Sequence, residues 1–165
     1  MTKIQTGSFK VFTYKAGLLA RLAHDLRLNL GKFEVTYDAG KVTARFWPES
    51  LSVDGSAKKG TVDSTTPSQS DKTKIHGTIT DTILETRKYP EIVFEGTGDD
   101  GTGKVRGDLT LHGQTHEIEL TVRESSGAYT GALDLVPSRW GIKPYKAVGG
   151  AIKLQDKVRV EFEIS

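Results

Sequence analysis

Apolar and polar residues alternate along most of the chain, and this two-residue period predicts β-strands with one buried face. In residues 158–164 every second residue is apolar, and the residues between them are Arg159, Glu161 and Glu163. Residues 26–37 keep one apolar face except at Gly31, where the parity shifts and a bulge or bend is expected. The same alternation marks residues 41–46, 105–111, 118–123 and 133–135.

Short turn sequences separate these runs, among them Asp38-Ala39-Gly40, His112-Gly113-Gln114-Thr115 and Ser125-Ser126-Gly127. Tight turns between consecutive strands favour an antiparallel meander, because parallel strands need longer crossover connections. We count about eight strands, which must close or stack to protect their edges. The sequence therefore predicts an all-β fold, an antiparallel meander closed into an eight-stranded barrel, in a single domain of residues 1–165. A two-sheet sandwich is the alternative.

One longer segment departs from the strand period. Residues 71–87 place Ile75, Ile79 and Ile83 at helical spacing, with Ser70 or Asp71 available as the N-cap. The Tyr89-Pro90 dipeptide is expected to end this helix, because a residue before proline avoids helical dihedrals. Its single apolar face needs a partner, and one end of the barrel is the obvious surface.

Two other segments also lack the strand pattern. Residues 16–23, with Leu18, Leu19 and Leu22, predict a short helical turn. The stretch between Asp54 and Ser70 is rich in Gly, Ser, Thr and Lys, and it predicts a mobile surface loop.

Composition narrows the class of protein. The 165 residues include no cysteine, which excludes disulfides, thiolate metal sites and thiol nucleophiles. There are 23 Lys and Arg residues against 21 Asp and Glu residues, a net charge of +2 that gives no indication of a nucleic-acid surface. No run of residues is apolar enough to span a membrane as a helix. The first residues lack a secretory signal, so we expect a cytoplasmic protein; a chain that had lost an export signal would instead be periplasmic.

Candidate catalytic chemistry is sparse. His112 and His116 have a metal-ligand spacing, but they flank a hairpin turn, so we interpret them as exposed turn residues. His24-Asp25 lies where a strand begins, and we favour backbone hydrogen bonding over a role in a ligand site. Pairs such as Glu117 and Glu119 fall on the outer face of a strand, where solvation is the simplest role. The sequence thus predicts no enzyme, no cofactor and no metal.

Four segments, in order, resemble the YceI-like family of lipocalin-like barrels. The closest match is the strand-hairpin-strand sequence VRGDLTLHGQTHEIEL. The others are a Tyr-Pro-x-Ile-x-Phe segment, an Arg-Trp-Gly-Ile segment with Trp where Phe is usual, and a His followed by Gly-x-Phe. They lie at Val105–Leu120, Tyr89–Gly96, Arg139–Ile142 and His24 with Gly31 and Phe33. The resemblance extends over most of residues 7–165.

The resemblance implies a lipocalin-like barrel of about eight strands, with a helix near one end. It further implies that a long isoprenoid or similar amphiphilic lipid binds in an elongated apolar interior, without catalytic residues. Gly96 departs from the family pattern, which has Ser there. The middle helix and the polar stretch after Gly55 depart as well.

Inner-face parity and these motifs together give a set of candidate site residues. The candidates for the apolar lining are Leu28, Phe33, Phe46, Phe94, Leu109, Leu133 and Phe162. The candidates for contact with a polar head group at the barrel mouth are His24, Arg139, Trp140 and Tyr145. An apolar lipid is the expected partner, and exposed strand edges would also permit a homodimer. A filled interior, in a structural or interaction module without a ligand, is the alternative.

Overall fold

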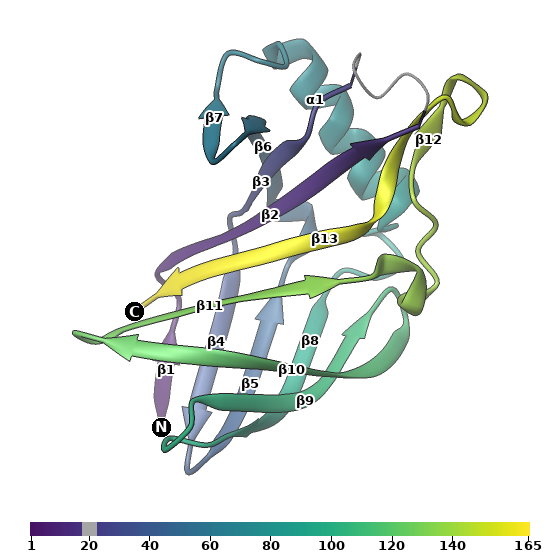
Figure 1. Ribbon diagram of the computed structural model, residues 1–165. Coiled ribbons are helices and arrows are strands. Elements are labelled where there is room, and N and C mark those ends of the chain that lie inside the picture. Colours follow the sequence, from purple (N-terminus) through teal and green to yellow (C-terminus); the bar gives the residue numbers. More distant parts are fainter. Residues whose placement is uncertain (18–22) are drawn as a thin grey trace.

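The computed structural model covers residues 1–165 and describes residues 1–17 and 23–165. In this part of the chain it contains thirteen strands, one helix that ends in a π-type turn, and short 3-10 turns (Figure 1). The strands are β1 (Thr2–Ile4), β2 (Gly7–Ala16), β3 (Leu26–Leu30), β4 (Phe33–Asp38), β5 (Lys41–Phe46), β6 (Leu51–Lys58), β7 (Thr61–Asp63), β8 (Ile92–Gly98), β9 (Lys104–Leu111), β10 (Gln114–Ser125), β11 (Ala128–Leu135), β12 (Lys146–Ala147) and β13 (Ile152–Ile164). The helix is α1 (Gln69–Gly77), which continues as η3 (Thr78–Ile83), and the 3-10 turns are η2 (Pro48–Ser50), η4 (Pro137–Trp140) and η5 (Val148–Gly150).

All strand pairs are antiparallel, in the order β1-β4-β5-β8-β9-β10-β11-β13-β2-β3-β6-β7, with β12 on β13. The chain runs from β3 into β4 through Gly31-Lys32 and from β5 into β6 through residues 47–50, so each of these pairs is one bent strand. Two backbone hydrogen bonds hold the bend, Gly31 N to Ser50 O (3.1 Å) and Trp47 N to Lys32 O (3.2 Å). The bend predicted at Gly31 is therefore confirmed.

Counting the bent strands once leaves eight long strands, and the all-antiparallel prediction is confirmed. No ladder among the described residues joins β1 to β7, the two outermost strands of the sheet. The sheet instead turns back on itself at the two bends. At each bend the chain continues without a break, but the strand after the bend pairs with different neighbours from the strand before it.

The inward faces of the strands bury two apolar clusters. One surrounds Phe9, whose ring centroid lies 4.8 Å from that of Phe33 and 5.0 Å from those of Phe46 and Phe162. The other consists of Ala44, Phe94, Leu109 and Trp140. The strand alternation thus places the apolar side chains inside and the charged ones outside, as the sequence predicted.

The helix lies at one end of the sheet (Figure 1), and Ile75 and Ile79 pack against the Phe9 cluster as expected. Its predicted bounds are wrong at both ends. The N-cap is Ser68, whose hydroxyl accepts a hydrogen bond from the Asp71 amide (3.2 Å). The helical turns end at Ile83, well before the proline, because Glu85 adopts a left-handed conformation that no helix can continue through.

Two other sequence predictions concern connections. The predicted loop after Asp54 is wrong, since β6 continues to Lys58 and pairs with β7. The predicted helical turn of residues 16–23 falls mostly on residues 18–22, which lie outside the described residues. None of the helices in the described ranges is long and apolar enough to cross a membrane.

Candidate functional site

The inward faces of the strands surround a cavity of about 220 Å³, and every residue that lines it is apolar. The lining residues are Phe9, Val11, Leu30, Val35, Val42, Ala44, Phe46, Leu51, Ile92, Phe94, Val105, Leu109, Leu111, Ile118, Leu120, Val122, Leu133, Leu135, Val160, Phe162 and Ile164. An apolar cavity of roughly 150 Å³ stays dry and binds benzene. This cavity is therefore large enough for an apolar group, and its walls offer water no hydrogen-bonding partner.

Five of the seven residues predicted to line the interior do so, namely Phe46, Phe94, Leu109, Leu133 and Phe162. Leu28 and Phe33 are buried in the Phe9 cluster and line neither this cavity nor the outer groove described next. Phe9 was missing from the predicted lining, although it contacts three other phenylalanine rings. The polar residues Ser8 and Lys10 on either side of Phe9 were the signal that would have identified it.

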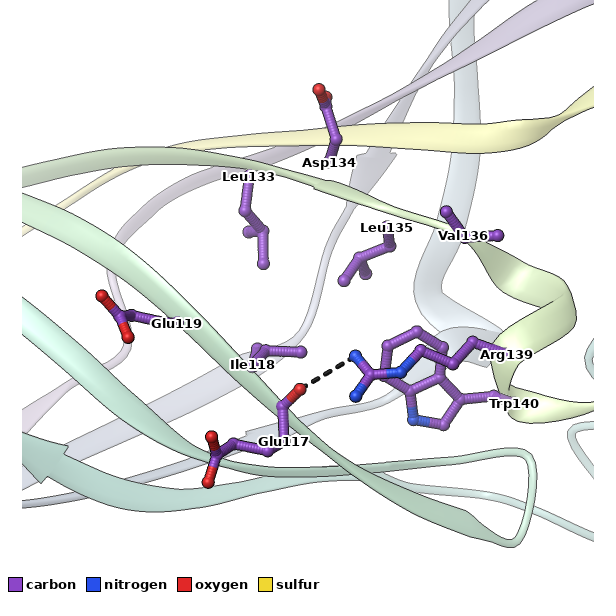
Figure 2. A pocket seen from close by; sticks show the side chains of 9 residues that line it. All are labelled: Glu117, Ile118, Glu119, Leu133, Asp134, Leu135, Val136, Arg139 and Trp140. Atoms are coloured by element: carbon purple, nitrogen blue, oxygen red, sulfur yellow. Dashed lines mark hydrogen bonds between the residues drawn. The ribbon is translucent and has the colours of Figure 1, made fainter.

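A second, outer groove of about 240 Å³ lies between β10 on one side and the end of β11 with the segment that follows it on the other. Figure 2 shows its wall, with the carboxylates of Glu117, Glu119 and Asp134 pointing away from the leucine side chains of β11. Each of these carboxylates has a cation nearby: Arg106 at 2.8 Å, Lys104 at 4.0 Å and Arg159 at 3.3 Å, respectively. The hydrogen bond to Glu117 raises the pKa of Arg106 above its ordinary value.

Of the four predicted head-group residues, Arg139 and Trp140 lie side by side in this outer groove, with the guanidinium 5.2 Å from the indole ring. Trp140 is 1% exposed, and its Nε1 donates to the Leu109 carbonyl (3.0 Å). Its one polar atom is therefore not free to bind a head group. Arg139 is exposed and donates from Nη1 to the Glu117 carbonyl (2.9 Å). His24 and Tyr145 line neither the cavity nor the groove.

Two further candidates from the sequence were the His24-Asp25 pair and His112. Asp25 accepts a hydrogen bond from the Lys15 amide (2.7 Å), which is the backbone role expected from the sequence. His112 lies in the predicted turn, but the exposure predicted for it is wrong. Its side chain is 15% exposed, lies 2.7 Å from a Glu85 carboxylate oxygen and packs on Tyr89. Among the described residues, no three His, Asp or Glu side chains gather in a way that would hold a metal.

The fold and the cavity together define a class: a single antiparallel sheet, turned back on itself around an apolar interior, with one helix across an end. The family model for the YceI-like domain matches residues 5–165. The chain therefore belongs to the YceI-like family, and the resemblance carried by its four motifs is confirmed.

Solved structures agree with this fold. BcnA from Burkholderia cenocepacia is 15% identical with a TM-score of 0.63, over 96% of this chain and 94% of its own. A polyisoprenoid-binding domain from Saccharophagus degradans is 13% identical with a TM-score of 0.62, over 98% and 95% of the two chains. A YceI protein from Campylobacter jejuni is 15% identical with a TM-score of 0.53, over 84% and 82%. No curated protein matches the sequence.

Proposed function

We propose that this protein binds the apolar chain of an isoprenoid-type lipid in the interior cavity and carries out no chemistry on it. The observation that carries the proposal is the lining itself, which consists of apolar side chains throughout. The lining offers a ligand burial and shape but no acid, base or nucleophile. A neighbour in fold is a polyisoprenoid-binding domain, which supports an isoprenoid as the first ligand class to test.

The cavity volume limits how much of a chain it can hold. If benzene fits in roughly 150 Å³, the 220 Å³ here suits about nine carbon atoms, close to two isoprene units. Burying about nine such groups gives about 7 kcal/mol. Association costs at least about 4 kcal/mol, which leaves about 3 kcal/mol, weaker than millimolar affinity. Tighter binding therefore requires the chain to continue beyond the cavity or to widen it.

Native mass spectrometry of the purified protein, followed by organic extraction and lipid identification, tests the proposal directly. A retained mass of isoprenoid character is the expected result. The purified protein should also bind N-phenyl-1-naphthylamine, an uncharged fluorescent probe, with an increase in emission. Its naphthyl ring has ten carbon atoms, close to what the cavity holds, and its phenyl ring would extend beyond the cavity. If the purified protein yields no extractable lipid and does not bind the probe, the interior serves only as the hydrophobic core.

A further inference from the structure

The ladder between β10 and β11 is incomplete. Its register runs from Ser125 opposite Ala128 to Val122 opposite Gly131 and stops there, although both strands continue. Over the remaining lengths, residues 114–121 pair only with β9 and residues 132–135 only with β13. Figure 1 shows the two strands diverging from their shared hairpin. The wall of the sheet therefore contains a slot between β10 and β11.

The β10 edge of this slot carries backbone groups without strand partners. The Val122 amide donates to Gly103 O (2.8 Å) on the β9 side, so by alternation the odd-numbered residues of β10 direct their groups toward β11. The Glu117 carbonyl confirms this direction, since it accepts the Arg139 hydrogen bond. The amide and carbonyl of Glu119 face the slot in the same way.

The segment after β11 keeps the slot open. Pro137 starts η4 and has no amide hydrogen to continue a ladder. The Ser138 amide donates to Asp156 on β13 (2.9 Å), and the buried Trp140 is anchored to Leu109 on β9. These contacts draw the chain away from β10, and the Arg139 side chain spans the distance that backbone pairing would otherwise close.

The slot lies between the outer groove and the interior cavity. Ile118, Leu133 and Leu135 line both of them, so at this point only these side chains separate inside from outside. Figure 2 shows the three apolar side chains between the two strands, with Arg139 at one end. Side chains can change rotamer without any rearrangement of the strands.

Side chains also lie across the two open ends of the folded sheet. At one end Ile75, Ile79 and Leu84 from the helical segment pack against the Phe9 cluster. At the other end the Tyr37 hydroxyl donates to Asp100 (2.8 Å). The Tyr37 ring and the Val42 and Val105 side chains meet there around Gly98.

We propose that the slot between β10 and β11 is a side opening through which an apolar chain enters the cavity, with its polar end held outside at Arg139. This inference rests on the proposed function and accounts for a chain longer than the cavity can hold. A guanidinium has five N–H donors, and the Arg139 hydrogen bond to Glu117 O uses one of them. The ligand class is therefore an amphiphile with one long apolar chain and a head group that accepts hydrogen bonds.

The absence of cysteine allows the slot to be closed chemically. Continuing the hairpin register places Glu119 opposite Asp134, so a disulfide in the variant E119C/D134C should link the two strands covalently when oxidised. The control is R123C/T130C, a pair that already lies in register within the ladder. Association and dissociation rates of N-phenyl-1-naphthylamine are measured by stopped-flow fluorescence before and after reduction. We expect both rates to fall at least about tenfold in the oxidised slot variant, to recover on reduction, and to stay unchanged in the control.

If the disulfide does not form, a short bis-maleimide bridges the same two thiols, and the expectation is the same. Normal rates in the bridged protein would overturn the side opening while leaving ligand binding intact. No probe binding by the unmodified protein would instead overturn the proposed function and, with it, this inference. Hydrogen exchange gives a readout without any ligand: the Glu119 amide should exchange rapidly, and protection equal to that of the paired strands would show that the slot is closed in solution.

Discussion

Replacing Ala44 with leucine tests whether the interior is hollow. Ala44 is 5% exposed, lies on β5 opposite Phe94 and lines the cavity. The substitution adds three carbon atoms, which contribute about 2.4 kcal/mol if they fill empty apolar space. Ordering the longer side chain costs about 0.5–1 kcal/mol, which leaves a gain of about 1.5 kcal/mol in the free energy of unfolding. For a domain of this size the melting temperature should rise by about 3–6 °C.

The same substitution should weaken binding, because the added atoms occupy space that the ligand would use. Losing room for three carbons lowers the affinity for N-phenyl-1-naphthylamine by a factor of about 50. Urea denaturation measures the stability, and a fluorescence titration measures the affinity. Ala128→Leu is the control, since Ala128 lies at the β10–β11 turn and does not line the cavity. Its effect on stability should stay within about 0.5 kcal/mol, with unchanged affinity.

The opposite sign would refute the reasoning. In a core that is already filled, extra carbons force side chains off their rotamers and cost about 1–3 kcal/mol. A destabilised Ala44→Leu protein that still binds the probe as before would place the ligand elsewhere and leave the interior as packing.

Three further changes test the surrounding structure. Trp140→Ala should cost about 3–5 kcal/mol in a urea titration, because the indole is 1% exposed and bonds Leu109 O; a loss below 1 kcal/mol would contradict its anchoring role. Gly96→Ser should destabilise the protein by about 1–3 kcal/mol, because an added β-carbon would meet the backbone of the next strand. Gly77→Ala, in open space within the helix, should instead stabilise it by about 1 kcal/mol. Equal effects of the two substitutions in thermal melts would count against both assignments. Hydrogen bonds from the Gly101 amide and from Thr102 lower the pKa of Asp99. Ionised Asp99 therefore stabilises the fold above the unfolded-state pKa of about 3.9, and this stabilisation is lost as pH falls through the lower pKa of the folded state. An NMR titration that gives Asp99 its ordinary pKa would disprove this.

The alternation of residues was sufficient to predict most of the long strands and their inner faces. Each side chain of a strand points to the face opposite that of its neighbours, so parity together with the motif match placed Phe46, Phe94 and Phe162 in the cavity lining. The turn at His112-Gly113 was equally local, because both residues adopt positive φ angles in a two-residue hairpin. Predictions of this kind depend only on neighbours in sequence.

The features that sequence reasoning missed depend on contacts between distant segments. The helix ends at Ile83 because of the conformation of Glu85, which lies 2.7 Å from His112, 27 residues further along the chain. The slot depends on Trp140 bonding to Leu109 and on Ser138 bonding to Asp156. Parity marks the inner face of β11 but does not show that the hydrogen-bonded ladder between β10 and β11 ends halfway along β11.

The cavity has an energetic consequence for the free protein. At about 24 cal/mol per Å³, an empty space of 220 Å³ costs about 5 kcal/mol relative to a filled core. Total stabilities of domains are about 5–15 kcal/mol, so this is a large share. A ligand that fills the space recovers part of it and adds to the free energy of unfolding through binding linkage. Ligand and added side chain thus compete for one volume: saturating probe should raise the melting temperature of the natural sequence and have much less effect once leucine occupies position 44.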